Sequence, residues 1–168
     1  VSVYDKVRNS WTHYGVVEFA PEEDVRDIAE DAAGAAWLAT PRGLYRYDPT
    51  PDSWTRFGKR EGLPTEYITA VEAADGALWI GCSGGLMRLE DGQLTGYTTR
   101  DGLIDQQIEA LLEGPDGSIW VGTNSGLSRF RSGRFINYTS ADGPGNNTVW
   151  SLARDLDENI WIGTRGAG

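Results

Sequence analysis

The stretch DGSIWVGTNSGLSR, residues 116–129, decides the fold because three similar stretches accompany it along the chain. The others are GAAWLATPRGLYR (34–46), DGALWIGCSGGLMR (75–88) and ENIWIGTRGAG (158–168). Their tryptophans are 42, 41 and 41 residues apart: Trp37, Trp79, Trp120 and Trp161. A period in the low forties that is rich in strand formers and glycine is typical of β-propeller blades, in which each repeat is one four-stranded antiparallel sheet.

The third repeat shows how one blade is built. Short, partly apolar segments alternate with turn residues such as Pro115-Asp116-Gly117 and Ser132-Gly133. Segments of this kind, separated by glycine-containing turns, predict an antiparallel meander. We expect its four strands, named A to D from the innermost outwards, at 108–113, 118–123, 127–131 and 134–138.

The two ends of the chain each carry half of a repeat. Residues 1–15 align with residues 44–58 and therefore predict strands C and D of a blade, whereas residues 149–164 predict strands A and B of a last blade. The full blades are predicted at about 25–58, 68–98 and 108–138. We thus expect residues 1–168 to form a single all-β propeller domain or fragment of sixteen strands, with three complete blades and two complementary half-blades, or four blades' worth.

Three arrangements would satisfy the half-blades. They could pair within one chain as a four-bladed ring, or two chains could exchange halves and form an eight-bladed ring. The chain could also be an open arc of a larger propeller. Because unpaired strand edges associate readily, some form of closure or exchange is expected.

The repeated residues themselves predict packing rather than chemistry. One large, flat indole in each blade can fill the wedge between neighbouring sheets. A glycine two residues after the tryptophan allows another backbone to approach closely. We therefore expect structural roles for Trp37, Trp79, Trp120 and Trp161 and for Gly81, Gly122 and Gly163.

The net charge of −10 restricts the partners of the chain. An acidic surface repels phosphate backbones and anionic lipids, so we expect no nucleic-acid partner and no membrane-surface binding. No apolar run approaches the roughly 18 residues that a membrane helix needs. The first residues, VSVYDKVRNSW, lack the layout of a signal peptide.

The sequence contains no recognisable catalytic set. His13 is the only histidine and falls in a predicted outer strand, which leaves no basis for a Ser-His-Asp arrangement. The stretch Asp155-Leu-Asp157-Glu-Asn159 alternates oxygen ligands as a calcium loop does, but it lacks the later bidentate acid and is interpreted as a strand A–B turn. We predict that the chain is not an enzyme and needs no cofactor or metal.

A ligand site is expected at the end of the propeller where the D–A loops and the B–C turns meet. These connections are longer and more polar than the other turns, and amides, arginines and a tyrosine suit a polyol or a carboxylate. Solvated loop residues are the alternative interpretation. The candidate ligand-binding residues are Arg42, Tyr67, Gln107, Asn124, Asn147 and Arg165.

The complete repeat, with Gly62-Leu63-Pro64 and Asp101-Gly102-Leu103 in the loops between blades, resembles the two-component regulator propeller repeat. The resemblance covers nearly the whole chain. It implies the periplasmic or extracellular input region of a membrane-spanning histidine kinase or related regulator. Such regions recognise a signal, in several cases a carbohydrate, and dimerise.

These observations favour a non-catalytic ligand-sensing or interaction module of a two-component signalling sensor. One alternative is a propeller enzyme of the lyase or hydrolase type with its catalytic residues outside this fragment. Another is a structural module that closes a ring by exchanging half-blades. The expected partners are a carbohydrate or other small polar ligand, the rest of the parent chain, and further copies of the chain bound through the half-blades.

Overall fold

The computed structural model describes residues 1–14, 24–144 and 146–166, so Gly15, at the edge of the first predicted half-blade, lies outside the described residues. The described part contains sixteen strands. Blade I consists of β3 (Asp27–Glu30), β4 (Ala36–Thr40), β5 (Gly43–Asp48) and β6 (Ser53–Phe57). Blade II consists of β7 (Ile68–Ala74), β8 (Ala77–Cys82), β9 (Gly85–Glu90) and β10 (Gln93–Tyr97). Blade III consists of β11 (Ile108–Glu113), β12 (Ile119–Thr123), β13 (Gly126–Arg131) and β14 (Arg134–Tyr138).

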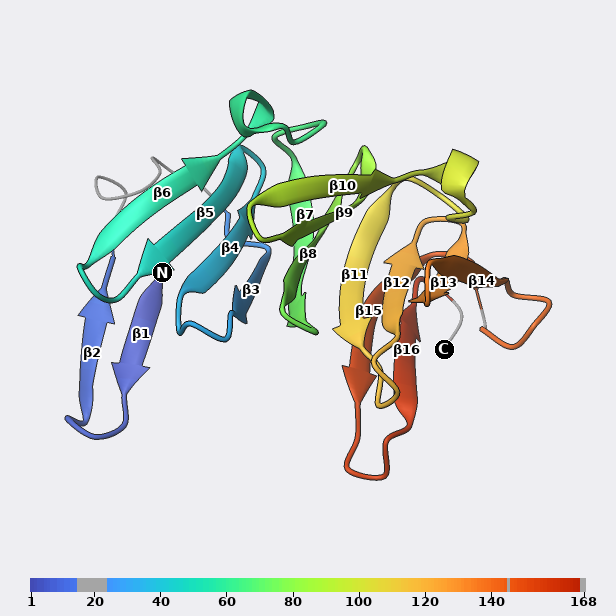
Figure 1. Cartoon of the computed structure of the whole chain (residues 1–168). Coiled ribbons are helices and arrows are strands. Elements are labelled where there is room, and N and C mark those ends of the chain that lie inside the picture. Colours follow the sequence, from blue (N-terminus) through green and yellow to red (C-terminus); the bar gives the residue numbers. More distant parts are fainter. Residues whose placement is uncertain (15–23, 145, 167–168) are drawn as a thin grey trace.

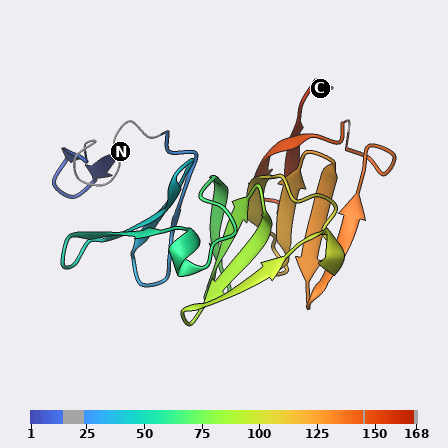
Figure 2. The same cartoon turned by 90° about the horizontal axis from the view of Figure 1, so that it is seen from above.

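Each blade is an antiparallel meander whose strands pair in chain order, which confirms the predicted β-propeller fold. The remaining strands form two separate hairpins, β1 (Ser2–Asp5) with β2 (Ser10–His13), and β15 (Val149–Arg154) with β16 (Ile160–Thr164). The hairpins lie at opposite ends of the row of blades in both views (Figures 1 and 2). Within this single chain, then, the two half-blades do not combine into one mixed blade, and the blades form an open arc.

The repeated tryptophans lie where one blade packs on the next. Trp37 of blade I is 5% exposed and belongs to one core cluster with Val71 and Ile80 of blade II. Trp79 of blade II is 4% exposed and packs with residues of blade III in the same way. Trp161, by contrast, is 65% exposed, because no blade follows β16 among the described residues. Burial of the indole therefore depends on the following blade.

The glycines after the tryptophans lie against the first residue of the next inner strand. A Cβ placed on Gly81 would lie 2.5 Å from Cγ2 of Ile108, and one on Gly122 would lie 2.8 Å from Cγ1 of Val149. Real Cβ atoms essentially never come so close to another carbon, so these two positions need a residue without a side chain. Blade I has Ala39 at the equivalent position, where it is fully buried.

Carboxylates also connect neighbouring inner strands. Oδ2 of Asp27 on β3 accepts the backbone N–H of Val71 on β7 at 2.9 Å. Oε1 of Glu72 on β7 accepts the N–H of Glu113 on β11 at 2.9 Å. Burial raises the pKa of Asp27 and of Glu72, and the nearby Asp27 raises the pKa of Glu72 further. Blades I and II thus each offer an acceptor to the inner strand of the blade that follows.

Candidate functional site

The D–A loops, where a ligand was expected, share a hydrogen-bonded turn. Two of them contain a 3-10 turn, η1 (Lys59–Glu61) and η2 (Thr99–Asp101). The carboxylate at the end of each turn accepts a backbone N–H three residues earlier, as Glu61 does from Gly58 at 2.7 Å and Asp101 does from Thr98 at 2.8 Å. A leucine just after each turn, Leu63 or Leu103, is buried in the core between blades. The loops are therefore fixed to the blades and do not depend on a ligand for their shape.

The B–C turns at the same end are closed by the last residue of strand B. The Thr40 hydroxyl donates to the Gly43 carbonyl at 2.8 Å, and the Thr123 hydroxyl donates to the Gly126 carbonyl at 2.7 Å. Cys82 stands in the same place in blade II, where its Sγ donates to a carbonyl at 3.3 Å. Cys82 is fully buried, and this burial raises the pKa of its thiol. The cysteine thus acts as a small hydrogen-bonding residue rather than as a reactive thiolate.

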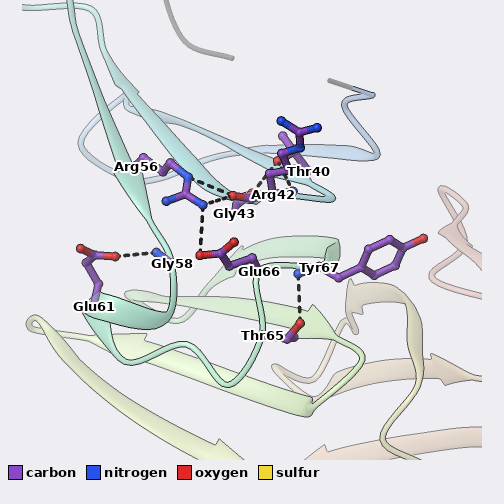
Figure 3. Close-up of polar contacts among 9 residues, drawn as sticks. All are labelled: Thr40, Arg42, Gly43, Arg56, Gly58, Glu61, Thr65, Glu66 and Tyr67. Carbon is purple, nitrogen blue, oxygen red and sulfur yellow. Dashed lines mark hydrogen bonds and ion pairs between the residues drawn. The ribbon is translucent and has the colours of Figure 1, made fainter. Parts of the chain in front are cut away.

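In blade I the turn and the loop are also joined to each other (Figure 3). Nε of Arg56 donates to the Arg42 carbonyl at 2.9 Å, and the same guanidinium lies 3.3 Å from the Glu66 carboxylate. The backbone N–H of Tyr67 donates to the Thr65 hydroxyl at 3.1 Å, and the Tyr67 ring points away from the Arg56–Glu66 pair.

Two of the predicted ligand residues contact a neighbouring blade or strand through their side chains. The guanidinium of Arg26 lies over the Tyr67 ring, 4.7 Å from its centroid. The side-chain amide of Gln107 donates to the Ser83 carbonyl at 3.2 Å, which ties blade III to the B–C turn of blade II. Both residues remain exposed, but these contacts already hold their side chains.

Three further predicted residues, Asn124, Asn147 and Arg165, also make contacts further along the arc. The Asn124 carbonyl accepts the Thr148 hydroxyl at 3.3 Å. The Asn147 side-chain oxygen accepts a backbone N–H of its own loop at 2.7 Å. The Arg165 guanidinium lies over the Trp150 ring at 5.2 Å. The six predicted residues are thus exposed on successive blades at one end of the arc, and none of them lines the cavities described next.

The largest of these cavities lies at the opposite end of the blades, where the A–B turns are. We call it groove I–II because it lies between blades I and II, and its volume is about 600 Å³. A smaller groove of about 280 Å³ occupies the corresponding place between blades II and III. Sequence reasoning did not predict groove I–II, whose walls include Asp31, Trp37 and Arg46 of blade I and Ala73, Ala74 and Ala77 of blade II.

The blade I wall of the groove is a small polar network. The Trp37 indole N–H donates to Asp31 Oδ2 at 2.8 Å. The Arg46 guanidinium lies over the Trp37 ring at 5.5 Å and pairs with Asp48 at 2.8 Å. Burial opposes ionisation of Asp31, but the hydrogen bonds from Trp37 and from backbone N–H groups, together with Arg46, lower the pKa of Asp31. The carboxylate is therefore charged at neutral pH.

One N–H group of Arg46, at Nε, makes no hydrogen bond within the described part of the chain. Its Nε is buried and has no hydrogen-bond partner among the described residues; Asp31 Oδ2 lies 4.0 Å from it, too far for a hydrogen bond. In blade III the equivalent Nε of Arg129 donates to the Ser118 hydroxyl at 3.0 Å. Blade I has Ala35 in place of that serine, so no hydroxyl is present. The sequence shows an arginine at the end of each of the three complete motifs, Arg46, Arg88 and Arg129. That the Nε of Arg46 lacks a partner among the described residues could not be read from this pattern, because it depends on the residue at the Ala35 position.

In the described ranges, no three His, Cys, Asp or Glu side chains are arranged to hold a metal ion. His13 is exposed, and its Nδ1 lies 2.8 Å from the Ser2 hydroxyl across the β1–β2 hairpin. The described strands and turns also include no helix with the length and apolarity of a membrane span.

Comparison with known proteins confirms the resemblance in the repeat. Residues 102–125, which run from the loop before blade III into its B–C turn, match the family described as Two component regulator propeller. None of the curated proteins is significantly similar in sequence to the chain.

Solved structures with the same fold include two extracellular domains and an enzyme. The extracellular domain of the hybrid two component system BT3049 from B. thetaiotaomicron is 23% identical, with a TM-score of 0.79 over 91% of this chain and 22% of that chain. The extracellular domain of the one component system BT4673 from the same organism is 22% identical, with a TM-score of 0.70 over 84% of this chain and 22% of that chain. A catalytically inactive virginiamycin B lyase from Staphylococcus aureus is 16% identical, with a TM-score of 0.67 over 84% of this chain and 49% of that chain. The chain spans less than a quarter of the two extracellular domains, and at these identities the similarity establishes the fold alone.

Proposed function

We propose that the chain is a non-catalytic, ligand-sensing propeller module of a two-component signalling sensor, placed in the periplasm or outside the cell. The observation that carries this proposal is the match of residues 102–125 to the two component regulator propeller family, because the matched segment includes the loop between blades as well as the strands. The extracellular domains of a hybrid two component system and of a one component system, which share the fold, support it.

The end of the arc with the D–A loops suits the recognition of a small polar ligand, such as a carbohydrate. Its loops are already held by hydrogen bonds, so binding would not have to order them. The proposed ligand-binding residues remain the exposed side chains at this end: Arg42, Tyr67, Gln107, Asn124, Asn147 and Arg165.

The test is a titration of the purified chain with maltotriose, xylotriose and citrate, followed by two-dimensional NMR of backbone and side-chain amides. A sensor is expected to show saturable shifts, and mass spectrometry should recover the ligand unchanged. A ligand that is hydrolysed or cleaved by elimination would contradict the sensor proposal. It would favour the propeller enzyme instead, for which the shared fold of the virginiamycin B lyase is the supporting observation.

A second candidate function is assembly through the half-blades. Large apolar side chains are exposed on both end hairpins, with Val3 and Trp11 on β1–β2 and Trp150 and Trp161 on β15–β16, each 47–65% exposed. Pairing of β16 with β1 of a second copy would cover some of this surface and continue the sheet. Analytical ultracentrifugation is the test, because assembly predicts a dimer or larger species and a strict monomer contradicts it.

A further inference from the structure

We propose that groove I–II binds one sugar unit of a neutral polyhydroxylated ligand, with Arg46 as the hydrogen-bond donor and the carboxylates of the groove as acceptors. The inference rests on the proposed sensing function but places recognition at the end of the blades with the A–B turns, opposite to the D–A loops.

The groove has the size of a small-molecule site, and small side chains form part of its blade II wall. Ligand pockets are commonly about 300–1,000 Å³, and groove I–II measures about 600 Å³. Ala73, Ala74 and Ala77 of blade II line it with methyl groups only. The A–B turn of blade II is also short, with Ala74 paired directly to Ala77 across Asp75-Gly76, so it does not fold over the opening.

Arg46 lines this space on the blade I side. Its stacking on Trp37 and its pair with Asp48 hold the guanidinium in place, and its Nε–H has no acceptor within the described residues. A buried donor without an acceptor costs free energy that a ligand oxygen would recover. In blade II the equivalent Arg88 is held differently, because both of its terminal nitrogens bond to Glu90 at 2.6 and 2.7 Å.

The charges of the groove determine the class of ligand. Its walls contain four carboxylates, on Glu30, Asp31, Asp75 and Glu113, and one guanidinium. Ionised carboxylates only accept hydrogen bonds and arginine only donates them. An anionic ligand would be repelled by the acidic excess, and a cation over Trp37 would meet the guanidinium already there. Hydroxyl groups both donate and accept without carrying charge, so a neutral polyol satisfies both kinds of partner.

The experiment uses the Trp37 indole N–H as the reporter, because it donates to Asp31 at the wall of the groove. Maltotriose, xylotriose and cellotriose are titrated into the ¹⁵N-labelled chain. The Trp37 signal is expected to shift saturably with at least one of them. Replacing Ala32, an exposed residue of the groove, by Phe should abolish the shift, whereas Phe at the adjacent exposed Ala33, outside the groove, should leave it unchanged.

A second pair of variants tests the donor. Arg46→Lys loses the Nε–H and should weaken binding by about tenfold, the effect of losing one hydrogen bond to a charged group, whereas Arg88→Lys should not change it. A shift that survives Ala32→Phe overturns the proposal, as does a Trp37 signal that moves with spermidine but with no sugar. Shifts confined to the side-chain amides of Gln107 and Asn124 also overturn it, yet they would leave the proposed sensing function standing.

Discussion

Replacing Gly81 by Ala tests whether contact between blades, rather than strand propensity, selects the residue after the tryptophan. The new Cβ would lie 2.5 Å from Ile108 Cγ2 and 3.3 Å from the Ala70 Cβ. The first distance is about 1 Å shorter than an ordinary carbon–carbon contact. Ile108 is 1% exposed and has no solvent side to move towards.

The magnitude follows from two opposing effects. Overpacking a tight core costs about 1–3 kcal/mol, whereas exchanging glycine for alanine inside a strand stabilises by about 0.5–1 kcal/mol. We therefore expect Gly81→Ala to lower the free energy of unfolding by about 1–2 kcal/mol. If strand propensity decided the outcome, the same substitution would stabilise the protein, so the sign of the effect distinguishes the two explanations.

Urea unfolding followed by circular dichroism gives the free energies, and a double-mutant cycle with Ile108→Ala localises the effect. Ile108→Ala alone should cost about 2–5 kcal/mol. The double variant should be less destabilised than the sum of the two single variants by about 1 kcal/mol or more, because the space it opens accepts the new methyl group. Ala39→Gly, the reciprocal change in blade I, should destabilise as well. A stabilised Gly81→Ala variant, or a cycle whose effects simply add, would refute the steric explanation.

Three further outcomes are expected. Cys82→Thr should raise the free energy of unfolding in urea by about 0.5–1 kcal/mol, because a hydroxyl makes the stronger hydrogen bond that the other two blades already have; a destabilised variant would contradict this. The pKa values of Asp27 and Glu72 are raised in the folded protein, so the protein loses stability as the pH rises through those values. Between about pH 4 and about pH 7, the melting temperature of Asp27→Asn should therefore rise relative to that of the unsubstituted protein. A difference in melting temperature that stays the same across this range would argue against the prediction. Leu63→Ala should cost about 2–5 kcal/mol in the same urea assay, whereas Leu156→Ala, at a fully exposed site, should stay within about 0.5 kcal/mol; equal effects would show that the loop leucine is not a core residue.

The strands could be predicted from the sequence because local signals determine them. In blade III the turn glycines Gly117 and Gly133 have positive φ, and the strands between the turns are close to the predicted ones. The fixed period then implied blades that pack on one another, which needs no knowledge of individual contacts.

The candidate sites were harder to predict because they depend on which residues of two blades meet. Gln107 reads as a ligand residue in the sequence, yet its amide bonds to the Ser83 carbonyl of the preceding blade. Arg46 looks like a repeated motif residue, and its buried, unpartnered Nε results from an alanine where blade III has Ser118. Such pairings are contacts between blades, and they cannot be read from the sequence before the blades are packed together.

The hydrogen bonds between inner strands give the arc a direction. Asp27 accepts a hydrogen bond from Val71, and Glu72 accepts one from Glu113. In both cases the acceptor lies on the earlier blade and the donor on the later one. Blade interfaces of this kind are heterologous, with a head surface that meets a tail surface. A stack of identical head-to-tail units has no intrinsic length: it ends only when its curvature returns the last tail to the first head, or else it continues as a filament. For this chain, the rotation between adjacent blades would decide between a soluble ring and a fibre.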